Sequence, residues 1–175
     1  MMEFRIETVY DARALRVMAR TLRKTVRKKH SRRSRILGWA LLILTVLLTF
    51  PLDGGPMVWN FRTGVNLVVL LALLSVLLFE DRINGFVAGK RMLRGTERCT
   101  TVFEEEAYRS ETELGESCFH YEKIPLVVES RDYFVFVFGP SHAQIYDLST
   151  LSGGSPQEFS TFLQGKTGKE ILRLQ

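Results

Sequence analysis

The chain has 175 residues, of which 46% are apolar and 25% are charged, and its formal net charge is +5. This length predicts one domain or two small ones, and two cysteines are too few for a disulfide framework. The charges are segregated: bases outnumber acids 12 to 3 in residues 1–35, whereas acids outnumber bases 12 to 6 in residues 99–175. The chain is therefore neither an evenly mixed soluble domain nor, with its high apolar content, a disordered tail.

Residues 1–35 predict a short strand followed by a long, basic, amphipathic helix. Met2–Tyr10 alternates apolar and charged side chains, which is typical of a strand. Asp11 is a suitable N-cap and no Gly or Pro follows before Gly38, so we expect a helix over Ala12–Arg35. The apolar stripe of this helix either lies on an anionic membrane surface or packs on the C-terminal domain.

Residues 36–81 predict a transmembrane α-helical hairpin. Two uncharged apolar runs, Ile36–Leu52 and Gly64–Phe79, have 17 and 16 residues. As helices they each rise about 25 Å, close to the ~30 Å hydrocarbon core of a bilayer. The turn signal Gly54-Gly55-Pro56 lies between them. A helix in a globular core keeps one polar face and these runs have none, so we expect two antiparallel spans.

Lys and Arg lie mainly outside the two runs, with only Arg62 between them. The positive-inside rule therefore places both termini in the cytoplasm. We expect basic side chains of the first helix and of a basic juxtamembrane helix over residues 82–98 to face anionic lipid headgroups. The side chains expected at this surface are Arg20, Arg23, Lys24, Arg27, Lys28, Lys29, Arg32, Arg33, Arg35, Lys90, Arg91 and Arg94. Because the membrane accounts for this charge, no nucleic-acid partner is expected.

Residues 99–175 predict a small cytoplasmic α+β domain. Ser155-Pro156-Gln157-Glu158 is a capping box with Pro at the first helical position, and it opens a C-terminal helix. We expect one set of alternating Phe side chains in the fifth strand to pack beneath that helix, against Phe159 and Phe162. The outline is that of an antiparallel pleckstrin-homology-like roll. Its strands are expected at Thr100–Glu105, Ala107–Thr112, Ser117–Tyr121, Ile124–Ser130, Tyr133–Phe138 and His142–Leu148.

The sequence offers no convincing catalytic, metal or cofactor site. Cys118 and His120 share a strand face, but a Cys–His nucleophile also needs an orienting group. Together with Cys99 and His142 they match no zinc spacing. The acidic residues between Glu104 and Glu116 are expected to form a solvated face. With the domain in the cytoplasm, both cysteines are expected to be reduced thiols.

Several residues in the C-terminal part resemble the YcxB-like family of small bacterial membrane proteins. The matching positions are Phe103-Glu104, Tyr121, Ile124, Tyr133-Phe134 and Glu158-Phe159. The resemblance covers nearly the whole chain, from the first strand and helix through the two adjacent spans to the final helix. It implies a pleckstrin-homology-like fold and a location in the bacterial cytoplasmic membrane, and it supplies no catalytic residue or cofactor.

We therefore expect a membrane-anchored cytoplasmic interaction or regulatory protein, an adaptor or sensor, and not an enzyme. Its expected partners are the lipid bilayer, anionic lipids of the cytoplasmic leaflet and a protein that the sequence does not identify. The alternative is a small transport or envelope-stress component that forms homo-oligomers through its transmembrane hairpin. The two hypotheses differ in whether residues 99–175 or residues 36–81 hold the partner.

Overall fold

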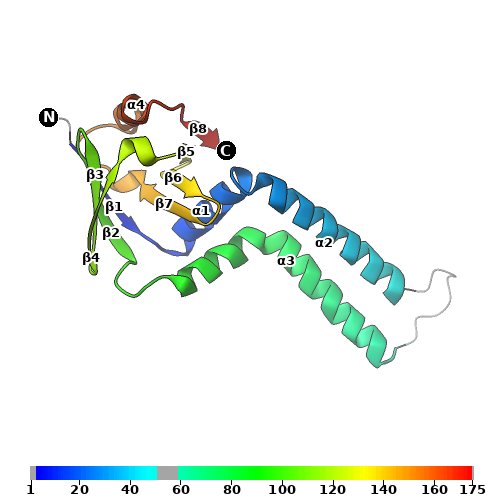
Figure 1. The fold of residues 1–175 in the computed structure, drawn as a ribbon. Helices are drawn as coiled ribbons and strands as arrows, with labels where there is room; N and C mark the ends of the chain where they lie inside the picture. Colours follow the sequence, from blue (N-terminus) through cyan, green and yellow to red (C-terminus); the bar gives the residue numbers. More distant parts are fainter. Residues whose placement is uncertain (1–2, 51–58, 175) are drawn as a thin grey trace.

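The computed structural model describes residues 3–50 and 59–174 and has an α+β fold (Figure 1). The helices in these ranges are α1 (Ala12–Lys24), α2 (Lys28–Thr49), α3 (Phe61–Arg91) and α4 (Pro156–Thr167). Two short 3-10 helices are η1 (Tyr121–Lys123) and η2 (Leu148–Thr150). The strands are β1 (Phe4–Val9), β2 (Arg98–Phe103), β3 (Ala107–Thr112), β4 (Gly115–His120), β5 (Leu126–Ser130), β6 (Tyr133–Gly139), β7 (His142–Asp147) and β8 (Leu172–Leu174).

These strands form two four-stranded sheets. The first has the order β1-β2-β3-β4, with every neighbouring pair antiparallel. The second has the order β7-β6-β5-β8, in which β8 runs parallel to β5 and the other pairs are antiparallel. The six strands predicted for residues 99–175 are confirmed to within two residues at each end. The short strand β8 was not predicted.

The N-terminal strand belongs to the same sheet as strands from the C-terminal part. β1 pairs with β2 along its whole length, from Phe4 opposite Phe103 to Val9 opposite Arg98. The three helices α1, α2 and α3 therefore all lie within the connection between two adjacent antiparallel strands (Figure 1). The division between residues 1–35 and residues 99–175 that composition suggested does not separate two folded units, because the first sheet contains strands from both.

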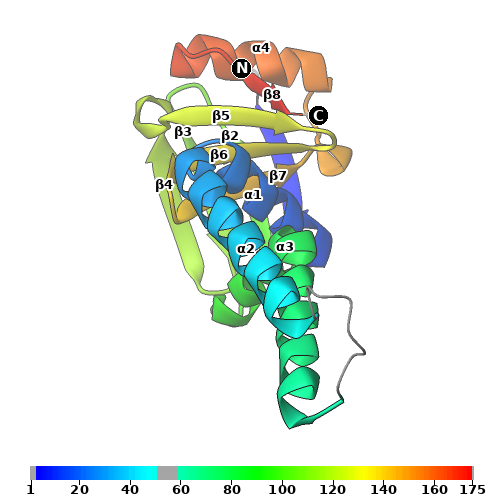
Figure 2. The same ribbon diagram turned by 90° about the vertical axis from the view of Figure 1, so that its right-hand side faces the viewer.

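Strand β6 is buried on both faces, which accounts for its continuous apolar sequence. Phe134 and Phe136 face an inner core shared with Phe159 of α4, and the Phe134 and Phe159 ring centroids are 5.5 Å apart. The expected packing of a β6 Phe side chain against Phe159 is confirmed, whereas the ring of Phe162 packs beside Phe4 and Tyr121. The opposite face carries Val135 and Val137 and packs against α1 (Figure 2). Of the two alternatives for the first helix, packing on the domain is therefore the one observed.

The prediction of one continuous helix over Ala12–Arg35 is wrong in one respect. The helix is interrupted by a turn at Thr25–Arg27, which separates α1 from α2. The N-cap is confirmed: the Asp11 carboxylate accepts a hydrogen bond from the N–H of Ala14 at 2.7 Å. At the break, the Thr25 hydroxyl donates to the Thr21 carbonyl at 2.7 Å. Here the sequence Thr25-Val26 places two β-branched residues of low helix propensity together. The break lets α1 lie on the second sheet while α2 leaves the domain.

Helices α2 and α3 pack against each other and project away from the β-strands (Figure 1). They approach closely at Gly38, where a Cβ atom would lie 2.8 Å from Cδ2 of Leu77. Within residues 3–50 and 59–174, α3 is the one helix long and apolar enough to cross a membrane. The α+β part of the expected fold class is therefore confirmed, whereas the two-span hairpin is not shown, because α2 begins with two basic turns and the first apolar run, Ile36–Leu52, ends outside the described residues.

The basic helix expected over residues 82–98 also differs from the structure. Residues up to Arg91 continue α3, and the following residues form turns that lead into β2 at Arg98. Gly95, with φ at +88°, belongs to this connection and favours a turn over a helix.

At the other end of the domain, the capping box of α4 is confirmed, and Gly168 ends the helix with φ at +63°. The hydrogen bonds from Ser155 lower the pKa of Glu158.

Candidate functional site at the helix junction

Three helices meet beneath the second sheet, where the apolar hairpin begins. The backbone of α3 is non-helical at Phe79, with φ −109° and ψ 21°, so the last part of α3 leaves the hairpin and runs back under α1 (Figure 1). Gly85 permits this crossing. A Cβ atom there would lie 3.1 Å from the backbone nitrogen of Arg16 and 3.2 Å from the carbonyl carbon of Leu15. The two helix backbones are therefore in close contact.

Two carboxylates directly after the kink bind basic side chains of α1 and α2. Asp81 accepts two hydrogen bonds from the guanidinium of Arg23, each of 2.6 Å. Glu80 lies 3.9 Å from Nε of Arg23 and 3.5 Å from Nε of Arg35, and it accepts a hydrogen bond from the Ser31 hydroxyl at 3.1 Å. These contacts join all three helices at one place.

The Arg23–Asp81 pair is largely shielded from water, with side chains 19% and 20% exposed. Its hydrogen bonds raise the pKa of Arg23 above the ordinary value, in opposition to desolvation, which lowers it. Arg23 is therefore protonated at neutral pH, and its guanidinium donates to both carboxylate oxygens of Asp81. Paired in both hydrogen bonds, the two side chains are suited to fixing the geometry of the junction and not to transferring protons.

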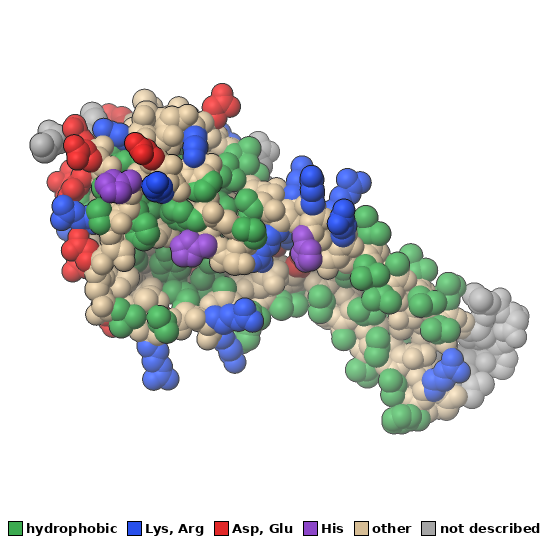
Figure 3. Space-filling model, viewed as in Figure 1, with side chains coloured by type: hydrophobic (Ala, Val, Ile, Leu, Met, Phe, Trp, Pro, Cys, Tyr) green, Lys and Arg blue, Asp and Glu red, His purple; other side chains and the backbone are tan. Residues whose placement is uncertain are grey.

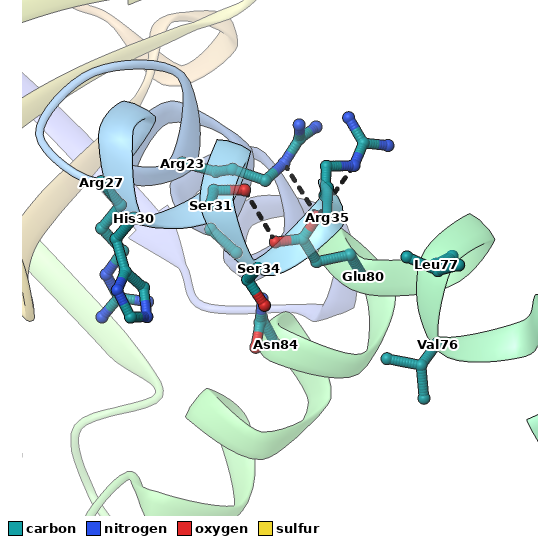
Figure 4. A pocket seen from close by; sticks show the side chains of 11 residues that line it. Arg23, Arg27, His30, Ser31, Ser34, Arg35, Val76, Leu77, Glu80 and Asn84 are labelled. Carbon is teal, nitrogen blue, oxygen red and sulfur yellow. Dashed lines mark hydrogen bonds and ion pairs between the residues drawn. The ribbon is translucent and has the colours of Figure 1, made fainter. Parts of the chain in front are cut away.

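A cavity of about 300 Å³ opens at this junction (Figure 4). Arg23 and Arg35 converge on Glu80 at one side of it, whereas Arg27 and His30 point away from this group. Its wall also includes the polar side chains of Ser31, Ser34 and Asn84 and the apolar side chains of Ala19, Val76 and Leu77. The arrangement combines hydrogen-bond donors with an apolar wall at the base of the hairpin.

The basic residues predicted to meet the membrane occupy three different settings. Arg23, Arg27 and Arg35 line the cavity at the junction. Arg20 lines a second cavity, of about 270 Å³, between α1 and the turn after β5. Lys24 is partly buried at the end of α1. The remaining residues are exposed on the first turns of α2 or around the end of α3: Lys28, Lys29, Arg32, Arg33, Lys90, Arg91 and Arg94.

The acidic side chains gather at the opposite end of the molecule from the hairpin (Figure 3). They lie on the outer face and edge of the first sheet, where β4 is the terminal strand and is exposed along nearly its whole length. Arg109 is 3.6 Å from Glu104 and 3.8 Å from Glu116. The ion pairs of Arg13, Arg23 and Arg35 in α1 and α2 are formed with Asp132, Glu80 and Asp81, which lie outside the acidic run from Glu104 to Glu116.

The cysteines and histidines are not assembled into one site. Cys99 is buried in β2, whereas Cys118 is exposed on β4. His120 is exposed at the end of β4, and the ring of His142 packs beside Phe138, with centroids 5.4 Å apart. Within the described ranges, no group of three or more His, Cys, Asp or Glu side chains is placed to hold a metal ion.

Sequence reasoning missed the acidic half of the junction. Glu80 and Asp81 were counted as the end of a span, and Gly85 as part of a basic helix. A signal was present: an antiparallel hairpin brings the start of its first helix close to the end of its second. The bases before Ile36 and the acids after Phe79 were therefore candidates for ion pairs with each other.

Comparison of the chain with family models, with curated proteins and with solved structures finds no match. The resemblance to the YcxB-like family therefore stays a prediction.

Proposed function

We propose that this chain is a membrane-anchored interaction or regulatory protein, in which the α2–α3 hairpin crosses the bilayer and the β-strands form a cytoplasmic domain. In this proposal the protein is an adaptor or sensor and not an enzyme. The observation that carries it is the ion-paired junction, which joins an exposed apolar hairpin to a folded, charged domain.

The surface of the hairpin supports membrane insertion. Large apolar side chains are exposed along both helices, among them Ile43, Leu44 and Leu48 of α2 and Val68 and Leu71 of α3. A soluble monomer rarely exposes so extensive an apolar surface. From Phe61 to the kink, α3 rises about 28 Å, which is close to the ~30 Å thickness of a hydrocarbon core.

The part of α3 after the kink supports the same placement. It turns one face, with the small residues Gly85, Ala88 and Gly89, toward α1, whereas Ile83 and Phe86 are exposed. Exposed basic residues flank these apolar side chains: Arg82, Lys90, Arg91 and Arg94. Apolar side chains bordered by cations are typical of a helix in the membrane–water interface.

The charge distribution supports a cytoplasmic location of the domain and of both termini. Basic side chains lie where α2 and α3 leave the domain, and Arg62 lies near the far end of the hairpin. The positive-inside rule assigns such a basic end to the cytoplasm. Trp59, exposed at the far end of the hairpin, is suited to the opposite interface.

The topology supports the proposed pleckstrin-homology-like roll. Four antiparallel strands, then three more, then a helix that packs on the core between the sheets are the elements of such a roll. In this proposal the helices α1–α3 are an insertion between its first two strands. The fold does not specify a ligand, so the interaction partner has to be inferred from the surface.

The acidic outer face of the first sheet suits a basic segment of a partner protein. It faces away from the hairpin and would remain accessible when the hairpin is in a membrane. Its ion pairs with Arg109 lie at exposed positions and are weak, so a partner would displace them at little cost.

Site-specific photocrosslinking in cells tests this function. A photoreactive residue at Glu116 on β4 is expected to trap one defined protein, and the yield should fall when Glu111 and Glu113 are both replaced by Gln. A matched probe at Val68 on α3 reports contacts of the hairpin. If the Val68 probe traps further copies of the chain while the Glu116 probe traps nothing, the oligomeric transport or envelope-stress alternative replaces the adaptor.

A further inference from the structure

We propose that the cavity at the helix junction binds a phosphate group, presented by the headgroup of one anionic phospholipid. This inference rests on the proposed membrane location of the hairpin, and it goes further because it assigns one bound lipid to one cavity. The diffuse attraction of a basic surface for anionic lipid needs no such cavity.

Several hydrogen-bond donors that line the cavity have no acceptor among the described residues of the protein. Arg27 donates one hydrogen bond, through Nε, to the carbonyl of Pro140, so the other N–H groups of its guanidinium can bind a ligand. Among the residues that the structure describes, the side chains of His30, Ser34 and Asn84 form no hydrogen bond or ion pair within the protein. Ser34 of α2 and Asn84 of α3 both line the cavity and point toward one another (Figure 4).

The charge of the cavity favours an anion. Among the described residues that line it, Glu80 is the one carboxylate; it lies near both Arg23 and Arg35 and accepts a hydrogen bond from Ser31. Asp81, next to the cavity, balances the charge of Arg23. Arg27 adds a positive charge that no described carboxylate pairs within 4.0 Å. Arginine together with neutral N–H and O–H donors is the usual set of ligands for phosphate oxygens.

The apolar part of the wall favours a lipid over a soluble phosphate. Val76 and Leu77 line the cavity from the part of α3 just before the kink at Phe79. Beyond them, the hairpin continues with exposed apolar side chains, such as Leu41 of α2. A headgroup in the cavity could therefore leave its acyl chains along a surface that is already apolar.

Native mass spectrometry of the full chain in neutral detergent tests the proposal. Phosphatidylglycerol, phosphatidylcholine and inorganic phosphate are titrated separately. We expect saturable binding of one phosphatidylglycerol per chain and binding of phosphatidylcholine weaker by about tenfold, because choline neutralises the headgroup. Equal affinity for the two lipids, or inorganic phosphate that binds as tightly as phosphatidylglycerol, would overturn the assignment to an anionic lipid.

Matched variants separate the cavity from the general basic surface. Arg27→Gln removes a charge inside the cavity, Arg32→Gln removes one from the exposed face of the same helix, and Asn84→Leu removes a donor without changing the charge. We expect the affinity for phosphatidylglycerol to fall about tenfold in Arg27→Gln and measurably in Asn84→Leu, but only slightly in Arg32→Gln. Equal losses in Arg27→Gln and Arg32→Gln, with none in Asn84→Leu, contradict a discrete site.

Alkaline extraction of membranes distinguishes this inference from the proposed function. If the wild-type chain stays in the membrane but binds lipid without saturation, the cavity proposal fails and the membrane anchor stands. If the wild-type chain is extracted as a soluble protein, the proposed function itself fails. Thermal unfolding of each variant checks that the loss of the Arg27–Pro140 contact has not unfolded the chain.

Discussion

Arg23 and Asp81 form the ion pair that links α1, which lies on the second sheet, to the kinked end of α3. Two short hydrogen bonds fix their relative orientation, and the surrounding helices exclude much of the water. Removal of one partner leaves the other charge poorly solvated, which costs more free energy than loss of an exposed pair.

A double-mutant cycle with Arg23→Gln and Asp81→Asn should give a coupling energy of about 1.5–3 kcal/mol in the free energy of unfolding. The exposed Arg13–Asp132 pair, whose atoms are also 2.6 Å apart, is the control and should give about 1 kcal/mol or less. Denaturant unfolding of the full chain in detergent measures both. Equal coupling in the two pairs would show that shielding from water has no role at the junction.

Burial raises the pKa of Tyr10 to about 12, from an ordinary value of 10.0. Above pH 10 the unfolded chain releases this proton whereas the folded chain retains it, so stability falls as pH rises. The contribution of protonated Tyr10 to the free energy of unfolding is complete below pH 10 and is lost between pH 10 and about 12. Burial also raises the pKa of Tyr108, Tyr121 and Tyr146.

We therefore expect alkaline unfolding above pH 10 to coincide with tyrosinate absorbance, followed by ultraviolet spectroscopy during pH titration. Tyr10→Phe should reduce the dependence of stability on pH in this range, because it removes one of the five tyrosines, Tyr133 included, whose pKa is raised by burial. An unchanged pH dependence in Tyr10→Phe would mean that Tyr10 ionises as easily in the folded chain as in the unfolded one.

At the scale of elements, the crossing of α1 and α3 depends on Gly85. Because the nearest atoms to a new Cβ belong to the backbone of α1, a larger side chain has to push the helices apart. Gly85→Val should lower the free energy of unfolding by about 1–3 kcal/mol. Gly64→Val in the same helix is the control, since no atom lies within 4 Å of its Cβ position. Equal thermal unfolding of the two variants would refute the close crossing.

The pairing of β1 with β2 makes a strong prediction about fragments. Phe4 and Ile6 of β1 are buried in the inner core, so residues 99–175 alone lack part of that core and should not fold cooperatively. A fusion that joins residues 3–10 to residues 97–174 through a short Gly-rich turn restores the strand, because the Tyr10 N–H and the Glu97 carbonyl are 2.8 Å apart. Circular dichroism during thermal unfolding should show a cooperative transition in the fusion and none in residues 99–175.

The strands and the capping box were predictable because each depends on neighbouring residues. Ala107–Thr112 begins and ends where the alternating pattern and its turn residues indicate, and the Ser155 cap needs only residues up to Glu158. The junction was not predicted because it depends on contacts distant in sequence. The partner of Arg23 is 58 positions away, and the second face of β6 is covered by a helix from the other end of the chain.

Composition was informative about the hairpin but misleading about domain boundaries. The basic N-terminal part and the acidic C-terminal part differ in charge, yet β1 and β2 share a sheet. The basic and the acidic segments form different surfaces of the same folded unit, so a change of charge along the sequence does not mark a domain boundary here. The pattern of buried residues in β1, with every second side chain buried, was the better guide to its place in the domain.

For the whole molecule, these features describe a β domain carried on an apolar hairpin, with an ion-paired junction between them. The acidic face lies at one end and the apolar hairpin at the other (Figure 3). Because α1 contacts both the second sheet and α3, a tilt of the hairpin would move the domain with it. A lipid bound at the junction and a protein bound at the acidic face would then contact parts of the molecule that move together.

The most direct test of the membrane topology is the labelling of exposed cysteines in intact cells with a membrane-impermeant maleimide, since the other thiol in both chains, Cys99, is buried. Two chains are compared: one with Cys118→Ser and Trp59→Cys, which places the thiol at the far end of the hairpin, and the natural chain, whose exposed thiol is Cys118 on β4. We expect labelling at position 59 in intact cells and labelling of Cys118 only after the cells are permeabilised. Labelling of Cys118 in intact cells, or protection of position 59 until permeabilisation, would contradict a hairpin that crosses the membrane with its β domain in the cytoplasm.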